Sequence, residues 1–345
     1  MKAVLLLFLL TAAEILAQGP LAPPAGAPAA GMRTLEQIEP RTPIPKSPVV
    51  PIAGPHFTIT QPGSYYLTGN VEVASGDGIV ISSGNVTLDL NGFALISKTA
   101  TPAAGSAILL SPNLRGVEVK NGRITGGAAR TQGASPWQAT FADKGWEGGI
   151  ISNETATTTN PQTAGILLSH LTIEQCYQGA ISFNGMCNLQ HIAAVHNGNN
   201  AIDIFGGSVD NVTVSYNGGN GLNAFSASVS NVTASYNKLV GIYLENGSAT
   251  NSAANFNGGG YGMYAESGTL DHCVATGNAE VGLGSSGGVI TGCRARANGR
   301  AGISTGLGVA AHCVASGNST NPSTVDKEIN VSAGGQRDAC VPATE

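Results

Sequence analysis

The chain repeats itself most clearly at NVTVSYN (residues 211–217), which returns as NVTASYN at residues 231–237. Related heptapeptides end on an Asn that recurs every 20 or 21 residues, at Asn197, Asn217, Asn237, Asn257, Asn278, Asn298 and Asn318. An earlier copy, NVTLDLN, occupies residues 85–91, and a divergent copy, HLTIEQC, occupies residues 170–176. A short fixed period of this kind indicates repeats that stack on one another.

Each repeat contains two short strands separated by a polar turn. In NVTVSYN the alternation places Val212 and Val214 on the opposite side from Thr213, as strand geometry requires. After each Asn, a small residue followed by an apolar one opens a second strand, as at Gly241 and Ile242. We therefore predict an all-β, right-handed parallel β-helix with coils of about 20 residues. The recurring Asn side chains would form a hydrogen-bonded ladder from coil to coil.

The repeat also predicts where most of the six Cys lie. Three of them are spaced by 20 residues and fall in the inward column that also contains Val212 and Val232: Cys273, Cys293 and Cys313. We expect these to be buried free thiols that act as small apolar side chains. Of the others, Cys176 and Cys187 are the pair that we expect to form a disulfide, if any pair does, and Cys340 stays unassigned.

Four His residues share one column of the repeat. They open the first strand at positions where other coils have Asn: His170, His191, His272 and His312. Because Asn and His interchange there, the column indicates a hydrogen-bonding role in a turn rather than a metal site.

The composition and the N-terminal segment limit the classes of protein to which this chain can belong. Only 11% of the 345 residues are charged, and 16 Lys and Arg against 21 Asp and Glu give a net charge of −5. A nucleic-acid-binding protein would show a basic surface, so we expect no nucleic-acid partner. Residues 1–17 resemble a secretory signal peptide, with Lys2 before a short apolar run. That run is shorter than the ~18 apolar residues of a membrane span.

The predicted organisation has three parts. Residues 1–17 form the signal peptide, residues 18–55 a Pro- and Ala-rich linker or strap, and residues 56–345 the β-helix, with an inserted loop at about residues 127–164. We expect an exported monomer, located in the periplasm, at the cell surface or outside the cell.

Two stretches resemble the opening of a known bacterial family. HFTITQPGSYYLTGN (residues 56–70) and GDGIVISSGNVTLDLNGFAL (residues 76–95) are similar to exported right-handed parallel β-helix repeat proteins of the pectate-lyase-like superfold. The resemblance implies that fold and an N-terminal capping strand pair turned at Pro62 and Gly63. It implies no reaction, and the polygalacturonase, pectate lyase and alginate epimerase motifs (GHG and RIK, RxPxxR, and DPH) are absent.

Outward positions of the second strand supply the candidate site. The alternation exposes a stripe of polar and aromatic residues, in which we assign Asn223, Tyr243 and Tyr264 to ligand binding. Tyr rings stack on sugar rings, and amides and carboxylates bind hydroxyl groups. Asp203 could form a catalytic pair with Glu245 or Glu266, because glycosidases use two carboxyl groups about 5–9.5 Å apart. Ordinary solvated surface is the alternative for these carboxylates.

The inserted loop is the second candidate, because long loops on a rigid scaffold often carry binding sites. It contains both Trp residues, Trp137 and Trp146, which either contact a ligand or anchor the loop. Between Gly145 and Cys293 the only basic residue is Lys238. This acidic segment favours neutral glycans over polyuronates unless calcium intervenes, and no motif supports a calcium site.

The sequence thus favours an exported β-helix that binds a polysaccharide or a cell-surface glycan, or that serves as a structural rod, without catalysis. One alternative is a polysaccharide-degrading lyase or glycoside hydrolase that uses outward carboxylates. Another is an adhesin or spacer, for which only the rod matters.

Overall fold

The computed structural model describes residues 39–152, 164–318, 329–331, 336–338 and 341–342. The chain divides into two units, Met1–Pro40 and Arg41–Glu345, and the description below concerns the second. The predicted signal peptide lies outside the described residues. Within the part that the structure covers, no helix has the length and apolar character needed to cross a membrane.

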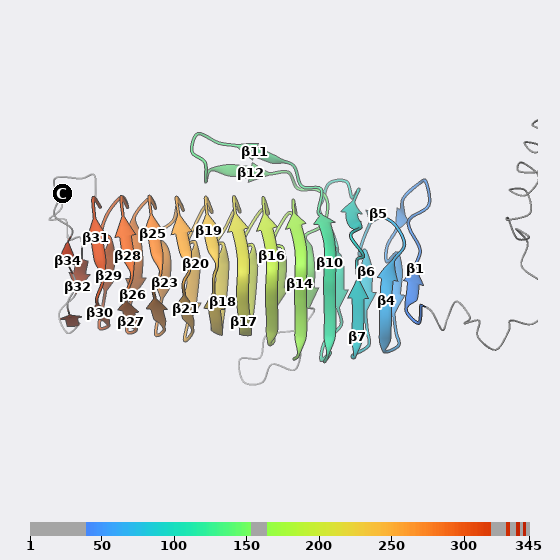
Figure 1. Cartoon of the computed structure of the whole chain (residues 1–345). Helices are drawn as coiled ribbons and strands as arrows, with labels where there is room; N and C mark the ends of the chain where they lie inside the picture. The colour runs from blue at the N-terminus through green and yellow to red at the C-terminus, as the bar shows by residue number, and fades with distance from the viewer. Residues whose placement is uncertain (1–38, 153–163, 319–328, 332–335, 339–340, 343–345) are drawn as a thin grey trace, which may run out of the picture. The chain divides into compact units, whose positions relative to one another are not determined.

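The second unit is a parallel β-solenoid in which each coil contributes strands to three faces (Figure 1). The first face contains β3 (Phe57–Ile59), β6 (Ile79–Ile81), β9 (Ser106–Leu110), β13 (Gly148–Ser152), β15 (Ile181–Phe183), β17 (Ile202–Ser215), β18 (Leu222–Ser230), β20 (Ile242–Glu245), β23 (Tyr261–Ala265), β26 (Val281–Ser285), β29 (Ile303–Thr305) and β32 (Ile329–Val331). The second face contains β1 (Thr42–Ile44), β4 (Gly63–Leu67), β7 (Val86–Asp89), β10 (Val117–Thr125), β14 (Ile166–Glu174), β16 (Cys187–Val195), β21 (Ser248–Thr250), β24 (Thr269–Asp271), β27 (Val289–Thr291), β30 (Val309–Ala311) and β33 (Gln336–Asp338). The third face contains β2 (Ile52–Ala53), β5 (Val71–Ser75), β8 (Ala94–Ser97), β19 (Thr233–Ser235), β22 (Ala253–Asn255), β25 (Val274–Thr276), β28 (Arg294–Arg296), β31 (Val314–Ser316) and β34 (Val341–Pro342).

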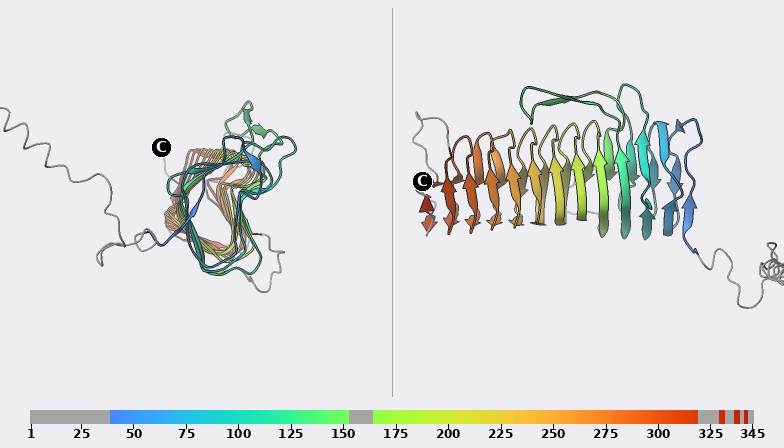
Figure 2. Two further views of the ribbon diagram at one scale, coloured as in Figure 1. Left: turned by 90° about the vertical axis from the view of Figure 1, so that its right-hand side faces the viewer. Right: turned by 45° about the horizontal axis from the view of Figure 1, so that its top comes forward.

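Long strands turn the corners between faces. β17 and β18 continue from the first face to the second, and β10, β14, β16 and β17 continue from the second face to the third. The pairings between coils are parallel, with a register shift only between Ile52 and Ala53 in the pairing of β2 with β5. The coils therefore superimpose when viewed along the stack (Figure 2). The predicted all-β, right-handed parallel β-helix is confirmed.

The core follows from strict alternation of side chains along each strand. Val212, Val214, Ile242 and Leu244 are buried, whereas Thr213 is exposed. The interior is a single continuous cluster, mostly of Val, Ile, Leu, Ala and Cys side chains. Since no single coil could enclose such a core, stacking provides the stability.

The predicted Asn ladder is present and buried. Asn257 shows its pattern: Oδ1 accepts hydrogen bonds from N and Nδ2 of Asn237, each 3.0 Å long. Its Nδ2 donates to Ala234 O and to Asn278 Oδ1, also at 3.0 Å. The same side-chain bond links each consecutive pair of the ladder, which consists of Asn197, Asn217, Asn237, Asn257, Asn278, Asn298 and Asn318. Each amide therefore satisfies buried backbone and side-chain groups of its neighbours.

The column of His and Asn residues forms the corner between the second and third faces. His170, His191, His272 and His312 have φ angles of 49–54°, as do several Asn of the column. Asn and His adopt this left-handed conformation more readily than most residues. These residues therefore lie in a turn, as predicted. The predicted hydrogen bonding is seen at His272, whose Nδ1 lies 2.7 Å from Asp271 Oδ1, whereas the rings of His170 and His191 stack with centroids 4.7 Å apart.

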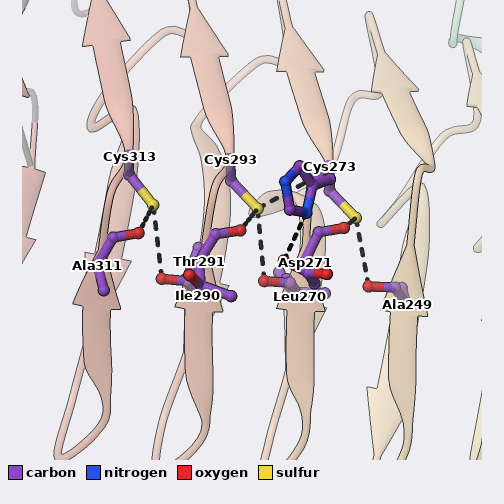
Figure 3. Close-up of polar contacts among 10 residues, drawn as sticks. Ala249, Leu270, Asp271, Cys273, Ile290, Thr291, Cys293, Ala311 and Cys313 are labelled. Atoms are coloured by element: carbon purple, nitrogen blue, oxygen red, sulfur yellow. Dashed lines mark hydrogen bonds and ion pairs between the residues drawn. The ribbon is translucent and has the colours of Figure 1, made fainter.

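The column of three Cys forms a second internal ladder (Figure 3). All three thiols are buried and free, as predicted. Cys293 Sγ accepts a hydrogen bond from Cys273 N at 3.2 Å and donates toward Leu270 O and Thr291 O, at 3.4 and 3.1 Å. One coil before Cys273, Ser252 Oγ occupies the same column and accepts from Val232 N at 3.1 Å. The thiols therefore form hydrogen bonds as well as filling space.

The expected bridge between Cys176 and Cys187 is not formed, because both thiols are free and buried. Cys176 precedes the Asn ladder, where its N–H donates to Asn197 Oδ1 at 3.0 Å. Cys187 instead begins a strand on the second face. The two side chains thus belong to different columns of the solenoid, and Cys340 lies outside the described residues.

Replacing Cys293 tests the hydrogen-bonding role of this column. We expect Cys293→Val to lower the free energy of unfolding by about 1–3 kcal/mol, because the buried N–H of Cys273 loses its acceptor. Cys293→Ser should stay within about 1 kcal/mol of the wild type, since a hydroxyl can accept that bond as Ser252 does. Urea unfolding followed by circular dichroism measures both. Cys187→Val is the control, and an equal loss for Cys187→Val and Cys293→Val would contradict a ladder role.

The solenoid begins earlier than the predicted boundary at residue 56. β1 pairs with β4 and β2 pairs with β5, so parts of the Pro-rich segment belong to the solenoid. Pro43 is accommodated because β1 lies at the edge of its sheet, where a missing N–H costs no ladder bond. The expected capping pair around Pro62 and Gly63 is also different: β3 and β4 lie on separate faces and each pairs in parallel with later coils.

Two further expectations are corrected by the register. NVTLDLN contributes β7, which stacks with β10 on the second face, and Asn91 is exposed instead of joining the ladder. The predicted insertion at residues 127–164 contains β13, a regular strand of the first face. What leaves the solenoid there is an antiparallel hairpin of β11 (Arg130–Gln132) and β12 (Ala139–Phe141). Residues 153–163 lie outside the described residues.

Candidate functional site

A groove of about 400 Å³ follows the edge of the first face. We call it the carboxylate groove, and it is lined by Asp77, Gly105, Ser106, Leu109, Glu147, Gly148, Ile151, Gln178, Gly179, Ser182, Asn199, Asn200 and Asp203. Its floor is a column of outward side chains in register, from Leu109 through Ile151 and Ser182 to Asp203. Its rim is formed by turn residues of the same coils. No Lys or Arg is among the lining residues.

Asp203 is the most constrained carboxylate of the groove. Its Oδ1 accepts hydrogen bonds from Asn200 Nδ2 at 3.1 Å and from Asn223 Nδ2 at 2.8 Å. Burial raises the pKa of Asp203 above its ordinary value, although these two amide hydrogen bonds act in the opposite direction. The side chain is therefore held in one orientation at the end of the groove, and its carboxyl group binds a proton more readily than a solvated Asp.

The three carboxylates of the groove are spaced along the solenoid axis. Asp77, Glu147 and Asp203 belong to the first, third and fifth of five consecutive coils. With about 4.8 Å between coils, neighbouring carboxylates are separated by about 10 Å along the axis. Asp77 Oδ1 already accepts the N–H of Ser106 at 2.8 Å. The groove thus presents hydrogen-bond acceptors over the length of several sugar units.

Aromatic side chains continue the first face beyond Asp203. The floor column runs on through Asn223 and Tyr243 to Tyr264. We call the adjoining rings the first-face aromatic cluster, which consists of Phe205, Phe225, Tyr243, Tyr261 and Tyr264. Phe205 and Phe225 stack with centroids 4.5 Å apart, and Tyr243 and Tyr264 stack at 5.7 Å. The sequence-predicted Asn223, Tyr243 and Tyr264 therefore form one continuous surface with Asp203.

The other two predicted carboxylates lie beside the aromatic cluster rather than in the groove. Tyr243 OH donates to Glu266 Oε2 at 2.9 Å. Burial, together with this bond, raises the pKa of Tyr243 to about 12. Glu245 follows Phe225 in the column two residues beyond that of Asp203. The structure brings Asp203 together with Glu147 and Asp77 in one groove and places Glu245 and Glu266 outside it.

The structure corrects the assignment of Trp146 to ligand binding. Its side chain is 0% exposed and belongs to the hydrophobic core. The indole Nε1 donates to Gly76 O at 2.8 Å. Trp146 therefore anchors the segment that leads from the hairpin back to the solenoid. Trp137 is half-buried near the hairpin tip and packs against Gly258, and its role in ligand binding stays a prediction.

Sequence reasoning did not place Asp77, Glu147 and Gln178 together at the edge of the first face. A signal was available: the small-then-apolar pair that opens the second strand also occurs at Gly78-Ile79, Gly149-Ile150 and Ala180-Ile181. When these pairs are aligned, Asp77, Glu147 and Gln178, which precede them, fall at the same rim of the carboxylate groove. The coils concerned precede the regular Asn repeat, so the Asn spacing does not include them.

Metal binding has no support in the described parts of the chain. No group of three or more His, Cys, Asp or Glu side chains lies close enough together there to hold an ion. The carboxylates of the groove are too widely spaced along the axis to share one cation.

Comparison with known proteins shows the fold. No protein-family model and no curated protein sequence matches the chain. Among solved structures, the periplasmic alginate epimerase AlgG is similar with a TM-score of 0.50 at 13% identity, over 82% of this chain and 76% of that one. The A-module of the Azotobacter vinelandii mannuronan C-5 epimerase AlgE4 has a TM-score of 0.47 at 11% identity, over 82% and 91%. The Dettilon tailspike protein has a TM-score of 0.41 at 13% identity, over 86% of this chain and 61% of that one.

Proposed function

We propose that the protein binds a polysaccharide along the first face, with sugar units in the carboxylate groove and on the first-face aromatic cluster. The observation that carries this proposal is the uninterrupted column from Ser182 and Asp203 through Asn223 to Tyr243 and Tyr264. It combines carboxylate, amide and hydroxyl groups with stacked rings on one flat sheet. The likeness of the fold to an alginate epimerase agrees with a carbohydrate ligand but does not identify it.

The charge of the groove favours a neutral sugar backbone. Asp77, Glu147 and Asp203 line it without a basic partner among the lining residues. A polyuronate such as alginate would bring further negative charges next to these carboxylates, which costs binding free energy. Hydroxyl groups of a neutral chain can instead donate hydrogen bonds to the carboxylate oxygens.

Asp203→Asn tests this function. The change keeps the shape of the side chain and removes its charge, so we expect about tenfold weaker binding of the best neutral oligosaccharide, the effect of losing one charge-assisted hydrogen bond. Isothermal titration calorimetry against hexasaccharides of glucose, xylose, mannose and galactose measures it. Asp210→Asn is the matched control, because Asp210 lies on the second face and bonds only within its surface. Equal affinities of the two variants, or no binding of any hexasaccharide, would contradict the proposal.

Hydrolysis of the bound glycan is a second candidate, favoured by one observation. Asp203 has a raised pKa and shares the groove with the exposed Glu147, and a glycosidase needs one protonated and one ionised carboxyl group. Their separation of about 10 Å along the axis is near the upper limit of about 9.5 Å for inverting glycosidases, so the candidate is an inverting reaction. Release of reducing ends that is abolished by both Asp203→Asn and Glu147→Gln would support this candidate. If Glu245→Gln, rather than Glu147→Gln, abolished the release of reducing ends, a catalytic pair of Asp203 with Glu245 would be favoured.

A further inference from the structure

A second cavity lies between the β11–β12 hairpin and the turns of the solenoid. It has a volume of about 420 Å³ and we call it the hairpin pocket, which is lined by Ala139, Thr140, Phe141, Tyr177, Gln178, Gly198, Asn199, Gly218 and Lys238. Gln178 and Asn199 also line the carboxylate groove. The two cavities are therefore neighbours that share one wall of amide side chains.

The hairpin that forms the outer wall is held by specific contacts. It runs along the turns outside the solenoid (Figures 1 and 2). Arg130 lies over the ring of Tyr216, 5.5 Å from its centroid, and its Nη2 donates to Pro136 O at 3.0 Å. Phe141 packs against Gly198 and Gly218 of two successive coils, and Trp137 packs against Gly258 further along. These contacts along the stack make the hairpin a fixed wall rather than a free loop.

Lys238 gives the hairpin pocket a charge opposite to that of the groove. It is exposed, and it lines both this pocket and a smaller one formed with residues of β11 and β12. Among the described residues no carboxylate forms an ion pair with it. It is also the only Lys or Arg between Gly145 and Cys293. Lys238 is thus a positive charge without an ion-pair partner among the described residues, and it lines a cavity together with two amide side chains and the rings of Phe141 and Tyr177.

We propose that the hairpin pocket binds an anionic substituent, a carboxylate or a sulfate, carried by a sugar of an otherwise neutral polysaccharide. The anion pairs with Lys238 Nζ, the amides of Gln178 and Asn199 bind ring hydroxyls, and Phe141 and Tyr177 contact the sugar ring. The inference rests on the proposed function, because the neutral backbone would lie in the adjoining groove. It makes the protein selective for sparsely acidic glycans over both neutral chains and polyuronates.

Monosaccharides test the pocket without requiring the groove. Saturation-transfer NMR on the full chain would compare glucuronate with glucose, and galactose 6-sulfate with galactose. We expect each anion, or one of the two, to bind about fivefold more tightly than its neutral partner, the upper range for one exposed ion pair. Raising the salt concentration should reduce the preference. Which anion shows it identifies the substituent.

Lys238 variants decide whether the preference comes from this pocket. Lys238→Ala should abolish it and Lys238→Arg should retain it, whereas Arg296→Ala, which removes an exposed positive charge on the third face, should leave it unchanged. A preference that persists in Lys238→Ala, or neither anion preferred by the wild type, would overturn the inference. If the neutral hexasaccharides did not bind, but the protein still preferred the anionic monosaccharide and lost that preference in Lys238→Ala, only the proposed function of the groove would be overturned.

Discussion

Replacing Asn257 by alanine should lower the free energy of unfolding by about 3–5 kcal/mol, because several buried polar groups lose their partners at about 1–3 kcal/mol each. Asn257 accepts two hydrogen bonds from Asn237 and donates to Ala234 O and Asn278 Oδ1. All of these bonds are buried. Water cannot replace the lost partners inside a closely packed solenoid. The measurement is urea unfolding followed by circular dichroism.

Asn255→Ala provides the matched control in the same coil. Asn255 lies in β22 two residues before Asn257, and its side chain points outward. An outward polar side chain of this kind contributes within about 0.5 kcal/mol. If Asn257→Ala cost no more than Asn255→Ala, the ladder would not be a source of stability. Because neighbouring coils stabilise one another, we also expect the loss to spread to the coils around Asn237 and Asn278, which hydrogen exchange can detect.

Much of the fold could be predicted because periodicity reports directly on stacking. A constant step of 20 or 21 residues from Asn197 to Asn318 leaves one register for the parallel strands, and alternation then determines which side chains are buried. The same rule failed for NVTLDLN. Its sequence is compatible with any strand whose side chains alternate between outside and inside. Its pairing with β4 and β10 is what shows that it belongs to the second face.

The candidate site was predicted only where the regular repeat reaches it. Asp203, Asn223, Tyr243 and Tyr264 occupy one outward column, and the Asn spacing aligned them correctly. Asp77 and Glu147 come from coils of unequal length, so their place at the same groove depends on turn geometry that the spacing does not contain. The hairpin pocket depends in addition on where β11 and β12 pack, which is a tertiary property.

The two Trp residues of the hairpin segment should differ sharply in their contribution to stability. We expect Trp146→Ala to lower the free energy of unfolding by about 3–5 kcal/mol, because removing a fully buried large side chain leaves a cavity. The loss also removes the donor to Gly76 O. The indole fills the space above Gly78, where its Cζ2 would lie 3.2 Å from an added Cβ.

Trp137→Ala is the comparison, and we expect a loss of about 1 kcal/mol or less, since its half-buried ring packs at the surface against Gly258. Trp146→Phe should fall between the two, because it keeps most of the apolar contact but loses the hydrogen bond. Urea unfolding of all three variants measures the order. Equal losses for Trp146→Ala and Trp137→Ala would contradict the anchoring role of Trp146. Because Glu147 follows Trp146 directly and lines the carboxylate groove, a folded Trp146→Phe variant should also bind neutral hexasaccharides more weakly than the wild-type protein does, which links the buried anchor to the proposed site.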